Sequence, residues 1–499
     1  MKTIFIIMDS LNKHYLNAYG QNKAITPNLD RLAKKSVVFD QHFSGSLPCM
    51  PARREMMTGR LNFLEAPWGP IEPWDDCLPV ELRNQKKIYS HIITDHYHYF
   101  HSGGEAYHTL FDSWEFPRGQ EGDKWKALVE DPEIPKFKGK NRRPYWVNRK
   151  FIDSQNDEDY PTPQCFMRAM DFVENNHNAD NWHLHLEVFD PHEPFVSPDH
   201  YKDLYGAHWD KDYHFDWPSY GPIDGDPDEV EYIRKCYNAS LTMADVWLGK
   251  FLDKMDEYDM WKDTAVILTS DHGHLLGEHG YWAKNYMFDY QELVNIPLFI
   301  HLPEKDKKDT NDNNRINALT ATMDIMPTLM ELHGAQLPPN VHGKSLLHLL
   351  QENDKDEEKV HHDAVIYGYF SKDVNIYDGR YSYCRQPLDG SYLYHYTAMP
   401  RGFSDFISRK QLASAEMGVF LNTTYGIPHY RMPINSKKHM DAPDYNIIYD
   451  LKDYDPNNQD NQSQPVHDKE LERKLENKLK ELLIRYDAPE CQFERLGLK

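Results

Sequence analysis

The sequence LPCMPARREMMTGR, which runs from Leu47 to Arg60, gives the clearest indication of how the chain folds and where its chemistry lies. Pro51 is typical of the first position of a helix and Gly59 of its end, so this stretch predicts a short helix with Cys49 just before its N-terminus. Free backbone N–H groups and the positive end of the helix dipole favour an anion beside Cys49, and Arg53 lies one turn further along. The same spacing also fits a small buried thiol that only packs beside the helix.

Two unbroken apolar runs, Thr3–Met8 and Thr264–Leu268, have the length and composition of central strands in a parallel sheet. Asp9 directly follows the first run, and Asp271 and His272 come shortly after the second. Ligands of open α/β sheets gather at the carboxyl ends of the strands. We therefore expect these three side chains to meet at one edge of the sheet, with the cysteine approaching from its helix entrance.

The pattern Cys49-x-Pro51-x-Arg53, followed by Thr58-Gly59-Arg60, resembles the signature of the type I sulfatases of the alkaline phosphatase superfamily. Ala52 replaces the serine that is commonest there, which leaves the core of the signature intact. The resemblance implies that a formylglycine-generating maturase oxidises Cys49 to formylglycine, whose hydrated aldehyde attacks the sulfur of a sulfate ester. It thus implies a sulfuric ester hydrolase acting on a carbohydrate sulfate or on a small aryl or alkyl sulfate.

The same resemblance implies a divalent cation with four ligands: Asp9, Asp271, His272 and the modified Cys49. Family precedent favours Ca²⁺, with Mg²⁺ or Mn²⁺ as alternatives. Sulfatases end the first strand with two adjacent aspartates, whereas this chain has Ser10 in the second position. Asn12 or a water molecule is a candidate for the missing ligand. We expect the cation to bind more weakly than in relatives with both aspartates.

The resemblance also implies roles for residues that would surround the sulfate. Arg53 and Lys284 would neutralise its oxygens, and His192, in a Pro-His-Glu-Pro sequence, would protonate or stabilise the leaving alcohol. His96 and His98 would replace the lysine and histidine of the family's Gly-Lys-x-His sequence. This pair could equally be surface residues on one face of a strand.

Composition divides the chain into two parts. Residues 1–350 alternate strand-length apolar runs with helical patterns, and the resemblance implies an alkaline phosphatase-like α/β fold with a large mixed, mostly parallel sheet and helices on both faces. The charged run Gln351–His362 is typical of a linker. Residues 363–499 predict a smaller α+β subdomain with an antiparallel sheet, closed by an amphipathic helix over Leu471–Tyr486. The segment Asn62–Asp76, rich in Trp, Pro and Gly, is typical of a surface loop beside the site.

The chain of 499 residues carries a net charge of −23, from 56 basic and 79 acidic residues. This charge argues against nucleic acid and an anionic membrane surface as partners, and it repels a sulfated polyanion. We therefore expect a small or short sulfated substrate. The six cysteines have no paired spacing that would indicate disulfides. The N-terminal apolar run ends at Asp9 and is too short for a signal sequence or a membrane span. Together these features predict a cytoplasmic protein. An oligomer is compatible with these features.

Two alternatives to a sulfatase are considered. A phosphonate monoester or phosphodiester hydrolase belongs to the same superfamily, shares the formylglycine and also replaces the second aspartate, as Ser10 does here. A metal-binding or carbohydrate-binding relative without turnover would keep Cys49 as a thiol, and Ser10 together with the missing lysine near His96 favours it.

Overall fold

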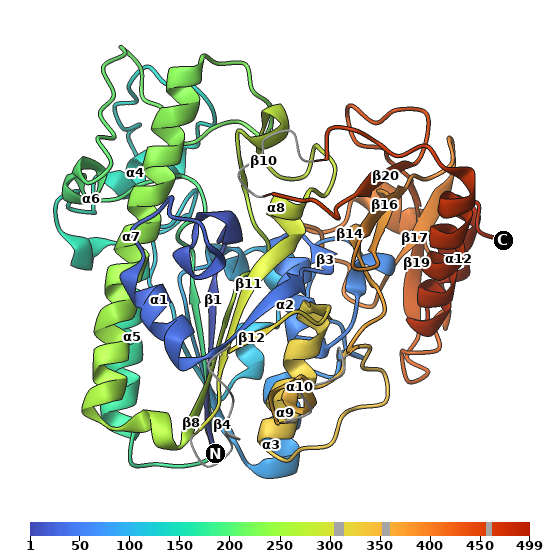
Figure 1. The fold of residues 1–499 in the computed structure, drawn as a ribbon, viewed down its shortest axis with the longest axis horizontal. Helices are drawn as coiled ribbons and strands as arrows, with labels where there is room; N and C mark the ends of the chain where they lie inside the picture. The colour runs from blue at the N-terminus through green and yellow to red at the C-terminus, as the bar shows by residue number, and fades with distance from the viewer. Residues whose placement is uncertain (304–313, 352–359, 456–461) are drawn as a thin grey trace.

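The computed structural model describes residues 1–303, 314–351, 360–455 and 462–499 (Figure 1). A nine-stranded sheet lies at its centre in the order β12-β2-β11-β8-β1-β6-β4-β5, with β13 also paired to β2. β11 is antiparallel to both of its neighbours, and the other pairs are parallel. The predicted large mixed, mostly parallel sheet is therefore confirmed. Its strands are β1 (Lys2–Met8), β2 (Val37–Phe43), β4 (Tyr89–Thr94), β5 (Ser113–Glu115), β6 (Trp182–Val188), β8 (Thr264–Thr269), β11 (Asn295–His301), β12 (Arg315–Ile316) and β13 (Thr320–Ala321).

The alternation of side chains along β1 explains why helices cover both faces of this sheet. Ile4 and Ile6 pack in one apolar core with residues of the helices on one face, and Phe5 and Ile7 pack in another core with residues of the helices on the other. Two separate cores form because successive residues of a strand point to opposite faces of the sheet. On the first face lie α1 (Pro27–Lys35), α5 (Pro161–Asn176) and α7 (Pro227–Glu257) (Figure 1). On the second lie α2 (Cys49–Thr58), α3 (Leu78–Lys86), α9 (Ile325–Leu332) and α10 (Leu347–Gln351).

The C-terminal part contains the predicted antiparallel strands, which are divided between two further sheets. One has the order β20-β16-β15-β14-β3, and the other β17-β19-β18. β3 (Ser46–Leu47) comes from the N-terminal part and runs parallel to β14, so the residues just before Cys49 belong to the C-terminal sheet. The division of the chain into a catalytic domain, residues 1–350, and a C-terminal subdomain, residues 363–499, stays a prediction. The other strands are β14 (Val365–Tyr369), β15 (Val374–Tyr377), β16 (Tyr381–Arg385), β17 (Tyr392–Thr397), β18 (Glu416–Gly418), β19 (His429–Asn435) and β20 (Ile447–Asp450).

Helix α12 (Lys469–Arg485), drawn in red in Figure 1, closes this part as predicted, with Leu475, Leu479 and Leu482 buried along one side. The remaining helices are α4 (Arg143–Arg149), α6 (Asp199–Asp203), α8 (Gln291–Val294), α11 (Arg409–Ala413) and α13 (Glu490–Arg495). A three-stranded sheet is formed by β7 (Gly221–Pro222), β10 (Tyr281–Ala283) and β9 (Leu275–Leu276). Within the four described ranges, no helix combines the length and apolar character needed to cross a membrane.

The segment Asn62–Asp76 is mostly buried, so the prediction of a surface loop was wrong. C-terminal residues cover it: the backbone N–H of Tyr396 donates to the Glu65 carbonyl, and Glu72 accepts hydrogen bonds from Thr397 and Ala398. The composition of the segment could not predict this burial, because the residues that cover it are more than 300 residues away in the sequence. Most of the predicted linker, residues 352–359, lies outside the described residues.

Candidate active site

Cys49 is buried at the first position of α2, at the carboxyl edge of the central sheet. We predicted that the helix begins at Pro51, but it begins two residues earlier, so Cys49 lies in the first turn rather than before it. Proline is tolerated there because the first backbone N–H groups of a helix have no partner within the helix. The pairing of β3 with β14 holds the chain that leads into this turn.

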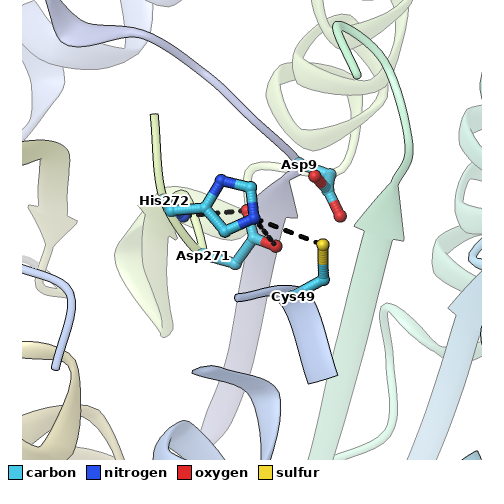
Figure 2. Close-up of side chains that lie close together, drawn as sticks. All are labelled: Asp9, Cys49, Asp271 and His272. Carbon is cyan, nitrogen blue, oxygen red and sulfur yellow. Dashed lines mark hydrogen bonds and ion pairs between the residues drawn. The ribbon is translucent and has the colours of Figure 1, made fainter. Parts of the chain in front are cut away.

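Asp9, Cys49, Asp271 and His272 converge on one point, as Figure 2 shows. One potential ligand atom from each lies within 4.8 Å of the others. The sheet brings them together because β1 lies directly beside β8 and parallel to it, so both strands end at the same edge. Cys49 Sγ is 3.2 Å from His272 Nε2, and that nitrogen is 3.4 Å from an oxygen of Asp271. The predicted metal ligands are therefore brought together.

The hydrogen bonds of His272 fix which of its nitrogens faces the cluster. Its Nδ1–H donates to the Gly273 carbonyl over 2.8 Å, so Nε2 carries the lone pair on the side of Cys49. Burial lowers the pKa of His272 to about 4, which keeps the ring neutral near pH 7. Two carboxylates with an oriented imidazole lone pair form a donor set that fits a divalent cation.

Arg53 lies among three buried carboxylates. Its guanidinium donates to Asp271 at 2.7 Å, Asp9 at 3.0 Å and Glu187 at 3.2 Å. Burial and the nearby charge of Asp271 both raise the pKa of Asp9. The pKa of Asp271 is lowered, because the charge of His272 in its protonated form and the charges of Arg53 and Lys284 outweigh the opposing effect of burial. Such coupled carboxylates release their protons most readily when a further cation lies between them.

Lys284 follows β10 and places its ammonium beside the cysteine. Its Nζ lies 3.3 Å from Cys49 Sγ and 3.1 Å from Nε2 of both His272 and His192. Burial alone would lower its pKa, but Cys49, Asp9 and other acidic groups raise the pKa of Lys284 above its ordinary value. Lys284 is therefore a buried cation at the centre of the predicted sulfate pocket.

His192 follows β6 and faces Lys284. Its Nδ1–H donates to the Glu193 carbonyl over 2.6 Å, so Nε2 is the acceptor that Lys284 contacts. Burial lowers the pKa of His192 well below its ordinary value, even though the charge of Glu193 opposes this effect. The resting proton of this pair is thus on Lys284, which donates to the lone pair of His192 Nε2.

His96 and His98 have different neighbours. His96 is fully buried after β4, and its Nδ1 is 3.5 Å from Asp9, so it belongs to the cluster. His98, in the short 3₁₀ helix Tyr97–Phe100, is also buried but has other neighbours, with its Nε2 3.8 Å from Glu121 and its ring against Trp68. Neither is a surface residue, so that alternative reading of the pair was wrong.

Ser10, which stands where sulfatases have the second aspartate, is itself bonded to the carboxylates of the cluster. The Ser10 hydroxyl donates to Asp9 at 2.9 Å, and its backbone N–H donates to Asp271 at 3.1 Å. Asn12 is engaged elsewhere, with its side chain bonded to the His274 carbonyl and the His14 backbone N–H. Asn12 therefore does not supply the missing ligand.

Sequence reasoning missed two glutamates that support the site. Glu187 accepts hydrogen bonds from Arg53, Thr94 and Tyr99, and the charge of Arg53 helps to lower its pKa to about 2 against the effect of burial. The charge of Glu187 inside the mostly apolar strand β6 was the feature of the sequence that could have indicated this role. Glu193 lies behind His192 and accepts from Tyr220 and from Lys140, the latter at 3.3 Å. Nothing in the sequence pairs Lys140 or Tyr220 with this site.

Comparison with known proteins agrees with this fold and site. Among curated proteins, the chain is 24% identical to the multifunctional alkaline phosphatase superfamily protein PehA of Trinickia caryophylli, over 79% of this chain and 85% of the relative. A protein solved in complex with its substrate D-glucosamine-2-N,6-O-disulfate aligns with a TM-score of 0.66 and 16% identity, covering 97% of this chain and 98% of that chain. The phosphonate monoester hydrolase of Agrobacterium radiobacter aligns with a TM-score of 0.65 and 16% identity, covering 97% and 95%.

The large, mostly parallel sheet with helices on both faces is the fold shared with these solved structures. The sequence model of the sulfatase family matches residues 2–335. The chain belongs to the sulfatase family, and its activity is accordingly that of a sulfuric ester hydrolase.

Proposed function

We propose that this protein hydrolyses a small or short sulfate ester through a formylglycine made from Cys49, with a divalent cation at Asp9, Asp271 and His272. One observation carries the proposal: Cys49 Sγ contacts both the His272 imidazole and the Lys284 ammonium, in the same cluster as two carboxylates. This arrangement places a nucleophile, a cation site and a cationic sulfate pocket at one point.

The unmodified thiol suits this reaction poorly. Burial and the charges of Asp9 and Asp271 raise the pKa of Cys49 well above its ordinary value, and the opposing charge of Lys284 does not reverse this. A thiol that stays protonated is a weak nucleophile. Conversion to a hydrated aldehyde would give the same position two hydroxyl groups, and this supports formylglycine as the working form.

In the proposed reaction one hydroxyl at position 49 loses its proton to Asp271, and its oxygen bonds to the sulfur of the ester. Arg53 and Lys284 hold the negative oxygens as the S–O bond to the alcohol breaks. The leaving oxygen takes a proton from Lys284 through His192, whose Nε2 lies 3.1 Å from Nζ. The second hydroxyl then returns a proton to Lys284 through His192, the C–O bond to the sulfate breaks, and the aldehyde forms again as sulfate departs. Water hydrates the aldehyde, and the proton on Asp271 is released with the product. A bound cation lowers the pKa of the attacking hydroxyl.

Ca²⁺ remains our first choice of cation, with Mg²⁺ and Mn²⁺ as alternatives, because the donors are mainly oxygens. We also propose a substrate of limited size, carrying its sulfate on a sugar or on a small aryl or alkyl group. A solved relative that binds a sulfated glucosamine supports the sugar. Activation by a maturase, a cytoplasmic location and a possible oligomer stay predictions.

A phosphonate monoester or phosphodiester hydrolase is the second candidate, favoured by Ser10 and by the similarity to a phosphonate monoester hydrolase. Rates on 4-nitrophenyl sulfate and 4-nitrophenyl phenylphosphonate separate the two functions. We expect kcat/KM to favour the sulfate by at least about tenfold, with both activities lost in Cys49→Ala. A phosphonate preference of that size would refute the sulfatase proposal.

A binding protein without turnover is the third candidate. It would need neither Lys284 nor His192 near Cys49, yet both are buried there with their nitrogens 3.1 Å apart. Buried charged and titratable groups are costly to keep without a use, so their presence disfavours this candidate.

A further inference from the structure

A second cluster of metal-binding side chains lies apart from the active site. Asp324, His361 and His362 are buried, and one potential ligand atom from each lies within 4.8 Å of the others. Asp324 immediately precedes α9, and the two histidines lie a few residues before β14. The cluster shares no residue with the group around Cys49.

The distances within the cluster resemble those between the ligands of one small ion. His362 Nε2 is 3.0 Å from both oxygens of Asp324, and His361 Nε2 is 3.2 Å from one of them. Donor atoms placed about 2.0–2.1 Å from a tetrahedral zinc ion lie roughly 3.3 Å apart. These pairs would have to separate by only about 0.1–0.3 Å to fit the ion.

A chain of hydrogen bonds determines which ring nitrogen of His361 carries the hydrogen. Nδ1 of His348 lies 2.9 Å from the Ser345 carbonyl and must donate to it, so the other nitrogen of a neutral His348 is an acceptor. That nitrogen contacts His361 Nδ1 at 3.4 Å, which therefore carries the hydrogen. His361 Nε2 then directs a lone pair toward the Asp324 carboxylate.

Two acceptors that face each other at 3.2 Å repel unless a cation lies between them. His361 Nε2 is buried and lies 3.2 Å from the carboxylate, but the angles are too poor for a well-formed hydrogen bond, so a shared proton explains the contact poorly. The carboxylate is also held in place, because the backbone N–H groups of Ala321 and Lys344 each donate to it over 2.8 Å. Orientation of a ligand by such outer contacts is typical of metal sites.

His42 on β2 has a buried nitrogen near this cluster, but it is not among the residues whose potential ligand atoms lie within 4.8 Å of one another. Its Nδ1 is bonded to Thr320 at 2.9 Å, whereas its Nε2 is buried without a hydrogen-bond partner.

We propose that Asp324, His361 and His362 bind one zinc-type transition metal ion, which holds the start of the C-terminal sheet against α9. Two imidazole nitrogens with one carboxylate favour Zn²⁺ over Ca²⁺. The site is structural: the ion joins residues far apart in the sequence, and Thr322, next to it, contacts Glu55 of α2 rather than the reacting groups. Its loss lowers stability more than turnover.

The test uses the full chain, freed of metal and reloaded with Zn²⁺ or Co²⁺. An Asp9→Asn, Asp271→Asn background removes ligands of the active-site cluster. In this background we expect about one equivalent of bound zinc, a visible Co²⁺ spectrum of the tetrahedral type, and a higher melting temperature with Zn²⁺. Adding His361→Gln and His362→Gln should abolish all three. Adding His200→Gln and His208→Gln, at exposed histidines, should change none of them.

The proposal is overturned if the His361 and His362 variants bind as much zinc as the matched control. If those variants do not fold, the background protein alone decides: a Co²⁺ spectrum without tetrahedral bands, or a melting temperature unaffected by Zn²⁺, refutes the site. A failure of the sulfatase proposal is seen only in turnover, so the two proposals are tested independently.

Discussion

At the scale of single residues, the site depends on which atom carries each proton. His272 and His192 both donate Nδ1–H to a backbone carbonyl, and both present Nε2 to Lys284. The neutral His272 imidazole and the Lys284 ammonium therefore contact Cys49 Sγ, and the neutral His192 imidazole contacts the same ammonium. This arrangement separates the roles, because one imidazole is free to hold a cation while the other passes a proton.

Cys49→Ser keeps one hydroxyl at the nucleophile position but cannot form the aldehyde. Sulfate transferred to that hydroxyl has no second hydroxyl to expel it, so we expect a stable sulfate ester on the peptide that contains position 49. Turnover should fall by at least about 10³-fold. Mass spectrometry after incubation with 4-nitrophenyl sulfate measures the ester. Cys236→Ser, at a buried cysteine of α7, is the control, and wild-type turnover in Cys49→Ser would contradict the mechanism.

At the scale of elements, Glu55 links α2 to two other parts of the fold. It accepts a hydrogen bond from the Ser46 backbone N–H of β3 at 2.5 Å and one from the Thr322 hydroxyl at 2.6 Å. Burial raises the pKa of Glu55 from 4.5 to about 7, although these hydrogen bonds oppose the change. The orientation of the cysteine helix therefore rests on a carboxyl that binds a proton more tightly in the folded state.

The contribution of Glu55 to stability is complete below pH 4.5 and is lost as pH rises through about 7. The loss amounts to roughly 3 kcal/mol of unfolding free energy. Glu55→Gln imitates the protonated acid, so we expect its melting temperature to fall less than that of the wild type between these pH values. Glu257→Gln, at an exposed position of α7, is the control. An unchanged pH dependence in Glu55→Gln would contradict this account.

At the scale of the whole molecule, the sequence predicts whatever is encoded in short stretches. Asp9 and Asp271 follow apolar strands, and parallel strands end at one edge, so their meeting was predictable. Glu193 and Lys140 meet although they are 53 residues apart, and no periodicity links them. The same holds for β3, whose two residues are recognisable as a strand only through their pairing with β14. Contacts between distant segments remain outside what local patterns encode.

The central claim is that formylglycine at Cys49 is the working nucleophile. The most direct measurement compares enzyme preparations that were matured to different extents by a formylglycine-generating enzyme. For each, mass spectrometry of the Cys49 peptide gives the fraction of aldehyde, and hydrolysis of 4-nitrophenyl sulfate gives the specific activity. We expect the activity to rise in proportion to the aldehyde fraction and to extrapolate to zero for the thiol. Full activity in a preparation whose Cys49 is entirely thiol would contradict the account.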